Sequence, residues 1–160
     1  MRSLQGKIVL VYLALAALAL GLLVMALVEL SLITDKVRTG SQVTEFFDTT
    51  LEIRRFEKNH FLYGQAGDLR ENARYIGRAR ELLRANRALF ATLAGAEPAR
   101  RLDADLAEYA ELMARHGLAA SDESLADAAR ALGKRIVVSA ETLAARERQS
   151  LSDDLDARRR

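Results

Sequence analysis

The sequence contains no cysteine, so several kinds of chemistry are excluded at once. Disulfide bonds, thiolate metal sites and thiol nucleophiles all require cysteine. The two histidines, His60 and His116, are too few to make a zinc site on their own. The net charge of +2 is too small to favour a nucleic-acid partner. No phosphate-binding glycine loop and no Ser/His/Asp arrangement is visible, so we expect no active site, no metal and no cofactor in this chain.

The sequence also lacks the features of β-structure. It has no tryptophan, its only proline is Pro98, and no stretch alternates apolar and polar residues between turn signals. Alanine, leucine, arginine and glutamate, which all favour helices, dominate its composition. The predicted fold class is therefore all-α.

One long stretch lacks any charge. The twenty-one residues from Ile8 to Val28 read IVLVYLALAALALGLLVMALV. As a helix this run is about 31 Å long, which matches the ~30 Å hydrocarbon core of a bilayer. A cleaved signal peptide is the alternative, but its apolar core is shorter and ends in a small-x-small site that this run lacks. We therefore expect an uncleaved membrane helix.

Charges around this run predict its orientation. Arg2 and Lys7 precede it, whereas acidic and basic residues balance one another after it. The positive-inside rule then puts the N-terminus in the cytoplasm. The expected organisation is a cytoplasmic tail (1–7), a transmembrane helix (8–30) and an extracytoplasmic domain (31–160).

Helical periodicity and glycine breaks predict four helices in this domain. They should cover about 31–63, 68–94, 98–116 and 122 onward, with Asp68 and Glu71 forming a capping box and with Ser121 or Asp122 capping the last helix. Short connections favour an antiparallel up-down four-helix bundle. The predicted apolar faces are Phe46, Thr49, Ile53, Phe56, His60 and Tyr63; Leu69, Ala73, Ile76, Leu83, Phe90 and Leu93; Leu102, Leu106, Tyr109, Met113 and His116; and Leu125, Ala129, Leu132, Ile136, Ser139 and Leu143.

The predicted helix lengths indicate where the C-terminus lies relative to the membrane. The fourth helix is long enough to return past the level at which the first one starts. We therefore expect the C-terminus to come back to the membrane surface, and the chain to be a fragment whose continuation crosses the membrane again.

Candidate binding residues cluster on the first helix of the bundle. Arg54, Arg55 and Lys58 place three cations within about one turn, and arginine binds carboxylates in bidentate fashion. These three residues are the predicted contacts of a small anionic ligand. The alternative is that they pair with Glu52 and Glu57 on their own helix.

The two histidines have ordinary structural interpretations beside their functional ones. His60 falls on the apolar stripe, as a hydrogen-bonded core histidine would, although a pH-sensing role is the alternative. His116 closes the third helix, where a cation suits the negative end of the helix dipole.

Three segments carry a resemblance to a known family. The segments Leu51–Gly64 (LEIRRFEKNHFLYG), Asp68–Ile76 (DLRENARYI) and Ala131–Val137 (ALGKRIV) resemble the helical periplasmic sensor region of bacterial two-component sensor histidine kinases. Chemoreceptor sensor regions are close relatives. The resemblance implies a homodimer in the bacterial inner membrane with a periplasmic bundle, and catalytic modules that this chain does not contain.

The expected function is that of a sensor and signal-transduction module, with a small anionic ligand or a periplasmic protein as its partner. The ligand-binding region of a methyl-accepting chemoreceptor is the alternative within signalling. A single-pass anchored adaptor or scaffold protein is the alternative from another class. Neither histidine fits a phospho-acceptor motif, because His60 is followed by Phe61 and His116 by Gly117.

Overall fold

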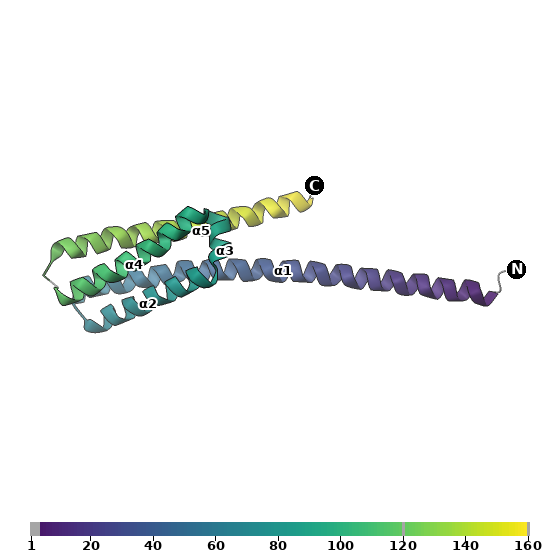
Figure 1. The fold of residues 1–160 in the computed structure, drawn as a ribbon, viewed down its shortest axis with the longest axis horizontal. Coiled ribbons are helices and arrows are strands. Elements are labelled where there is room, and N and C mark those ends of the chain that lie inside the picture. The colour runs from purple at the N-terminus through teal and green to yellow at the C-terminus, as the bar shows by residue number, and fades with distance from the viewer. Residues whose placement is uncertain (1–3, 120, 160) are drawn as a thin grey trace. The chain divides into compact units, whose positions relative to one another are not determined.

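In the computed structural model of this protein, the described part of the chain forms helices joined by short turns and contains no strand. The structure describes the backbone of residues 4–119 and 121–159, and their side chains except those of residues 4–9, 11, 29–38, 154, 155, 158 and 159. In chain order the helices are α1 (Leu4–Tyr63), α2 (Ala66–Ala85), α3 (Arg87–Ala94), α4 (Ala96–Leu118) and α5 (Glu123–Arg159) (Figure 1). The predicted all-α class is confirmed.

The chain forms two compact units, residues 1–38 and residues 39–160. The boundary lies within α1, which is helical from Leu4 to Tyr63. Among the residues that the structure describes, no helix meets the length and hydropathy needed to cross a membrane. The predicted transmembrane segment, residues 8–30, includes side chains that lie outside the described ones, and it remains a prediction.

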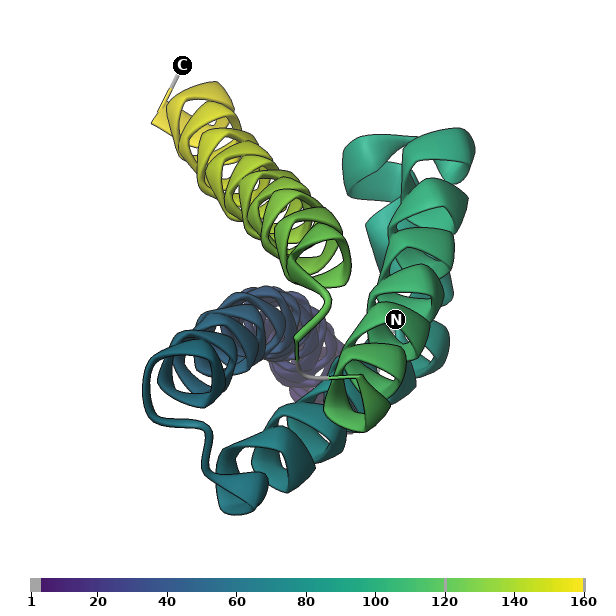
Figure 2. The same cartoon turned by 90° about the vertical axis from the view of Figure 1, so that its left-hand side faces the viewer.

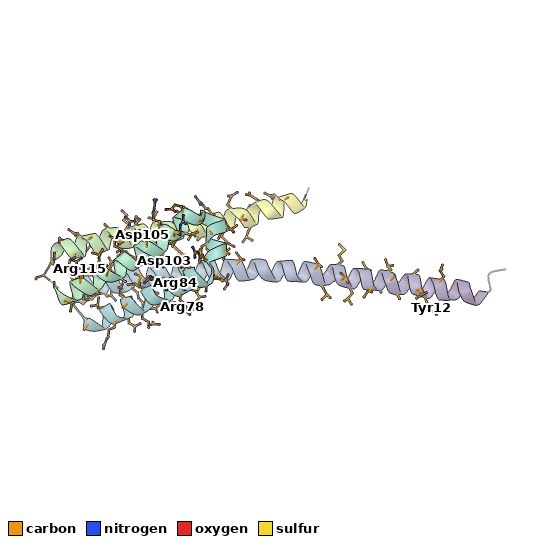
Figure 3. The ribbon with its side chains drawn as sticks, viewed as in Figure 1. Tyr12, Arg78, Arg84, Asp103, Asp105 and Arg115 are labelled. Carbon is orange, nitrogen blue, oxygen red and sulfur yellow. The ribbon has the colours of Figure 1, made fainter. Side chains whose placement is uncertain are left out.

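The first unit exposes apolar side chains on every side of α1. Tyr12, for example, is 70% exposed (Figure 3). The large apolar side chains exposed on this stretch are those of Leu10, Tyr12, Leu13, Leu15, Leu18, Leu20, Leu22, Leu23, Val24, Met25, Leu27 and Val28. A helix that is apolar all round has no polar face to turn to water.

The second unit is a helical bundle built from the last part of α1 together with α2, α4 and α5. Successive long helices run in opposite directions (Figure 1), and Figure 2 shows the bundle end-on. The short helix α3 lies across one end and contacts α2, α4 and α5. The expected antiparallel arrangement is therefore present.

The second predicted helix is interrupted, and this is the main correction to the predicted elements. It divides at Asn86, whose backbone leaves the helical region (φ −112°, ψ 28°) and whose side chain donates to the Leu82 carbonyl at 2.9 Å. Asparagine side chains compete for backbone groups in this way. The chain therefore turns nine residues before Gly95, which ends α3 at a positive φ of 96°.

The predicted capping box at Asp68 is also wrong, because α2 begins earlier. Its N-cap is Gln65, which makes no side-chain capping bond, and Asp68 lies in the first turn. Of the two caps predicted for the last helix, Ser121 and Asp122, the structure has Asp122: its carboxylate accepts hydrogen bonds from the backbone N–H groups of Ser124 and Leu125, at 3.0 and 3.3 Å.

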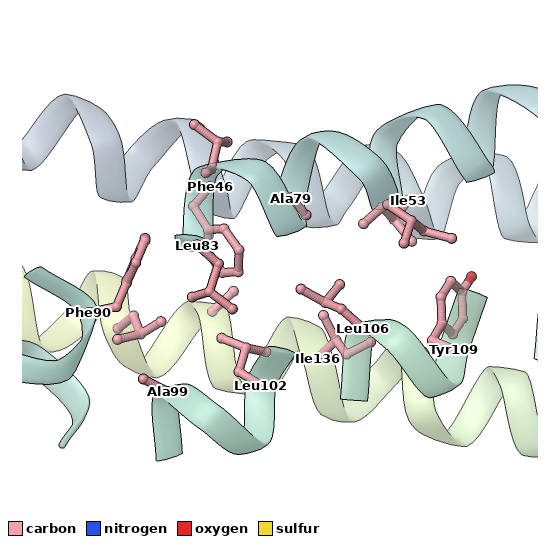
Figure 4. Close-up of a cluster of buried hydrophobic side chains, with 14 of the residues drawn as sticks. Phe46, Ile53, Ala79, Leu83, Phe90, Ala99, Leu102, Leu106, Tyr109 and Ile136 are labelled. Atoms are coloured by element: carbon pink, nitrogen blue, oxygen red, sulfur yellow. The ribbon is translucent and has the colours of Figure 1, made fainter. Parts of the chain in front are cut away.

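Most of the predicted apolar faces form the core of the bundle. Phe46 on α1 packs against Phe90 on α3 with their ring centroids 5.1 Å apart, and both are fully buried (Figure 4). The prediction is wrong for two residues, which do not belong to the core: Tyr63 is 68% exposed and Ala73 faces solvent. In place of Ala73, the polar side chain of Asn72 is buried.

Candidate functional site

A carboxylate lies inside the bundle. Glu57 on α1 is only 1% exposed, and one of its oxygens accepts a hydrogen bond from the Tyr109 hydroxyl of α4 at 2.7 Å. Burying a charge is costly unless it is paired and hydrogen-bonded. Burial and the nearby carboxylate raise the pKa of Tyr109 far above its usual range, so the phenol remains a hydrogen-bond donor.

The partner charge comes from the same helix. Arg54 lies one turn before Glu57 and forms an ion pair with its other oxygen. The Arg54 guanidinium also reaches the backbone carbonyl of Arg130 on α5, at 3.4 Å. The buried carboxylate is thereby bonded to α4 through Tyr109, and its arginine partner is bonded to α5.

Asn72 connects α2 to the same cluster. Its side-chain amide donates to the Ile53 carbonyl of α1 at 2.8 Å and to the Tyr109 hydroxyl oxygen at 3.2 Å. The Asn72 side chain is fully buried, and its carbonyl oxygen has no hydrogen-bond partner in the described structure. All four long helices of the bundle thus meet at a polar cluster made of Arg54, Glu57, Asn72 and Tyr109.

A glycine on α5 makes room for this cluster. A Cβ atom at Gly133 would lie 2.5 Å from a Glu57 carboxylate oxygen and 2.6 Å from an Arg54 guanidinium nitrogen. A second pair repeats the arrangement with the helices exchanged, because a Cβ at Gly40 on α1 would lie 3.1 Å from the buried Glu147 side chain of α5. Helices α1 and α5 are therefore in close contact where glycine on one faces glutamate on the other.

The two histidines meet one turn further along α1. His60 Nε2 and His116 Nδ1 are 3.3 Å apart, and the side chains are 8% and 6% exposed. Phe61 packs edge-on against His116, and Arg130 lies over the Phe61 ring. Because each hydrogen bond needs one donor and one acceptor, at least one of the two facing ring nitrogens must be unprotonated.

Burial and the surrounding charges favour neutral His116. Desolvation and then the neighbouring His60 and Arg130 lower the pKa of His116, against the opposing effect of Glu123 and Asp122. This lowered pKa opposes the expectation that His116 serves as a cation at the end of its helix. His60 is the hydrogen-bonded core histidine that its place on the stripe predicts.

The three predicted ligand contacts are not brought together into one site. Arg54 is partly buried and paired with Glu57, whereas Arg55 is 58% exposed and pairs with Glu52 at 2.7 Å. Lys58 is exposed. Both ion pairs are those of the alternative interpretation, pairing within the helix. A ligand role for the three cations stays a prediction.

The chemistry of the polar cluster is that of a buried hydrogen-bonded network. Within the side chains that the structure describes, no group of three or more His, Cys, Asp or Glu residues could hold a metal ion. A buried, charge-paired network fixes how helices register with one another, because a shift leaves its members without partners.

Glu57 and Asn72 were missed as site residues, although a signal for both exists in the sequence. Glu57 is spaced four residues after Ile53 and three before His60, so it lies on their face of the helix. Asn72 is spaced three residues after Leu69 and four before Ile76, so it also lies on the face that they share. Their residue types conceal this signal, because charged and amide side chains are normally exposed.

Comparison of the chain with protein-family models, with curated proteins and with solved structures finds no match.

Replacing Gly133 by alanine should destabilise the bundle, by about 1–3 kcal/mol, because the new methyl group overlaps the Arg54–Glu57 pair. The matched control is Gly77→Ala on α2, where a Cβ has no atom within 4 Å. That change should stabilise the protein by about 0.5–1 kcal/mol through helix propensity alone. Urea unfolding measures both. Equal stabilisation by the two changes would show that the close approach at Gly133 is absent.

Stability should fall as the pH drops from about 7.5 to about 5.5. The folded-state pKa of His116 is lowered, so the unfolded chain binds more protons over this interval and acid favours unfolding. The measurement is the urea midpoint at each pH. His116→Gln, which cannot titrate, should show a flatter dependence. A midpoint that rises on acidification, or an equal slope in the variant, would contradict the assignment.

Proposed function

We propose that this chain is a membrane-anchored, extracytoplasmic sensory module, in which α1 links an anchoring segment to a helical bundle. The observation that carries the proposal is that one helix, Leu4–Tyr63, contains both the apolar run and residues of the bundle core.

The anchor is supported by the surroundings of the apolar run. Its described large apolar side chains are more than half exposed, from Tyr12 at 70% to Val28 at 53%, and together they encircle the helix. Exposed apolar surface of this extent marks an interaction with protein or membrane. The length of the run and the absence of charge within it favour lipid.

The sensory role is supported by the contact between α1 and α5. Glutamate–glycine pairs at two levels, Glu57 with Gly133 and Glu147 with Gly40, bring the two helices into close contact. We propose that this contact has two discrete packings. A signal can shift such an equilibrium only by its differential affinity for the two packings. We propose a small displacement of α1 relative to α5 as the output.

The resemblance of the helical segments to sensor histidine kinases makes such a kinase the preferred setting for the module. In that setting it is a homodimer of the inner membrane, and its signal is a small anion or a periplasmic protein. A chemoreceptor has the same arrangement of anchor and bundle. An anchored adaptor would need no displacement of α1, and this difference separates it from both.

Labelling of introduced cysteines from one side of the membrane tests the proposed topology. The natural chain contains no cysteine that would react in the background. In intact bacterial cells a membrane-impermeant maleimide should label Leu118→Cys, a position 91% exposed in the bundle. Ser3→Cys should be labelled only after lysis. Labelling of Ser3→Cys alone in intact cells would show the opposite topology. Labelling of neither variant would place both positions in the cytoplasm.

A matched pair of variants separates insertion from other kinds of membrane attachment. Leu18→Arg with Leu22→Arg should release the protein into the salt-washed fraction, because each arginine costs about 2.5–3.5 kcal/mol at the centre of a membrane helix. Leu62→Arg, at a site 73% exposed in the bundle, should stay in the membrane. Equal retention of both proteins would show that the apolar run is not the anchor.

Displacement of α1 is measurable by spin labels at Leu51→Cys on α1 and Val138→Cys on α5, which are 43% and 52% exposed. In vesicles, pulsed electron resonance should resolve two label distances. The relative populations of the two distances should change with Glu57→Gln, since that change removes the buried charge of the α1 contact.

The control for this measurement is Glu71→Gln, which removes an exposed carboxylate paired only with Arg74 on the same helix. This variant should leave the relative populations of the two distances unchanged. A single distance, common to all three proteins, would overturn the displacement mechanism and favour the anchored adaptor.

A further inference from the structure

A pocket lies where α2, α3 and α4 meet, beside the bend at Asn86. Its volume is about 380 Å³, within the range of about 300–1,000 Å³ typical of small-molecule sites. It is separate from the buried polar cluster, with which it shares no residue. It exists because the chain turns at Asn86 and sets α3 across the ends of its neighbours.

The floor of the pocket is apolar. Leu83, Phe90 and Ala99 line it and belong to the hydrophobic core, with exposures of 4%, 0% and 8%. Ala91 and Ala96 complete the apolar lining with side chains too small to fill the space. A ligand in the pocket would therefore place an apolar group against the core.

The rim of the pocket is positively charged. It carries Arg84 from α2, Arg87 from α3 and Arg100 from α4, against one acid, Asp103. Figure 3 labels Arg84 and Asp103 on the ribbon. Each of the three arginines comes from a different helix.

The acids near the rim do not neutralise it. Asp103 is shared by Arg80 at 3.3 Å and Arg84 at 3.9 Å, and Glu97 pairs with Arg100. In the described structure no acidic side chain forms an ion pair with Arg87. The guanidinium groups of Arg84 and Arg87 are thus the ones best placed to bind an added anion.

We infer that this pocket binds a small organic carboxylate with an apolar body, such as an aryl- or alkyl-carboxylate. Guanidinium groups bind carboxylates through paired, charge-assisted hydrogen bonds. The apolar floor takes up the body of the ligand, which a bare inorganic anion lacks. Asp103 opposes highly charged anions such as polyphosphates.

A ligand in this pocket would hold α3, which is attached to α5. The guanidinium of Arg146 on α5 donates to the carbonyls of Leu93 and Ala94 at the end of α3, at 3.2 and 3.0 Å. Occupancy of the pocket would thereby act on the helix whose contact with α1 is proposed to carry the signal. This consequence rests on the proposed function, whereas binding itself does not.

The test is a titration of the full 160-residue chain with 4-fluorophenylacetate, followed by fluorine NMR of the probe. Saturable binding is expected, with a Kd on the order of 1 mM or tighter. The double variant Arg84→Gln, Arg87→Gln should weaken binding by about tenfold or more, because it removes two charge-assisted partners. The matched control, Arg70→Gln with Arg115→Gln, removes two exposed arginines outside the pocket and should change the Kd by less than about twofold.

Two further measurements test the apolar part of the site. Ala91→Phe should abolish binding by filling the pocket while leaving every arginine in place. The neutral analogue 4-fluorophenylacetamide should bind at least about tenfold more weakly than the carboxylate, because it cannot form the charge-assisted pairs. Inorganic phosphate should fail to displace the probe at equal concentration.

Three results would overturn the inference: no saturable binding in the unaltered protein, equal weakening by the two double variants, or displacement of the probe by phosphate. Unchanged thermal unfolding of each variant shows that the loss is not one of folding. The titration does not depend on which side of a membrane the bundle occupies, so its failure is distinguishable from failure of the proposed topology.

Discussion

The bundle depends on how the Glu57 carboxylate is accommodated at 1% exposure. A charge removed from water must find a counter-charge and hydrogen-bond donors, or the bundle does not close around it. Arg54 and Tyr109 meet these needs, and Asn72 holds Tyr109 in turn. The need to satisfy one carboxylate therefore ties all four long helices together at a single level.

This constraint also explains the composition of the α1 contact with α5. A large side chain at Gly133 would displace the ion pair, and one at Gly40 would press on Glu147. Apolar packing alone tolerates many similar arrangements, whereas a hydrogen-bonded charge tolerates few. The contact is therefore suited to a small number of defined packings.

Tertiary structure decides which arginines of this chain surround a cavity. Arg54 and Arg55 are engaged by acids one turn away on their own helix, and this local pairing leaves them less available to a ligand. Arg84, Arg87 and Arg100 are spread over three helices and meet at a pocket only because the chain bends at Asn86. Proximity along the sequence was thus a poor guide to which arginines surround a cavity.

Periodicity and turn chemistry in the sequence determined the helical class, the breaks at Gly64 and Gly95, the cap at Asp122 and most of the core, because these features depend on neighbours within a few residues. Only the tertiary structure decided the bend at Asn86, the burial of Glu57 and Asn72, the His60–His116 pair and the arginine-rimmed pocket. Each of these requires partners from helices distant in the chain, and a polar side chain is buried only when such partners are present.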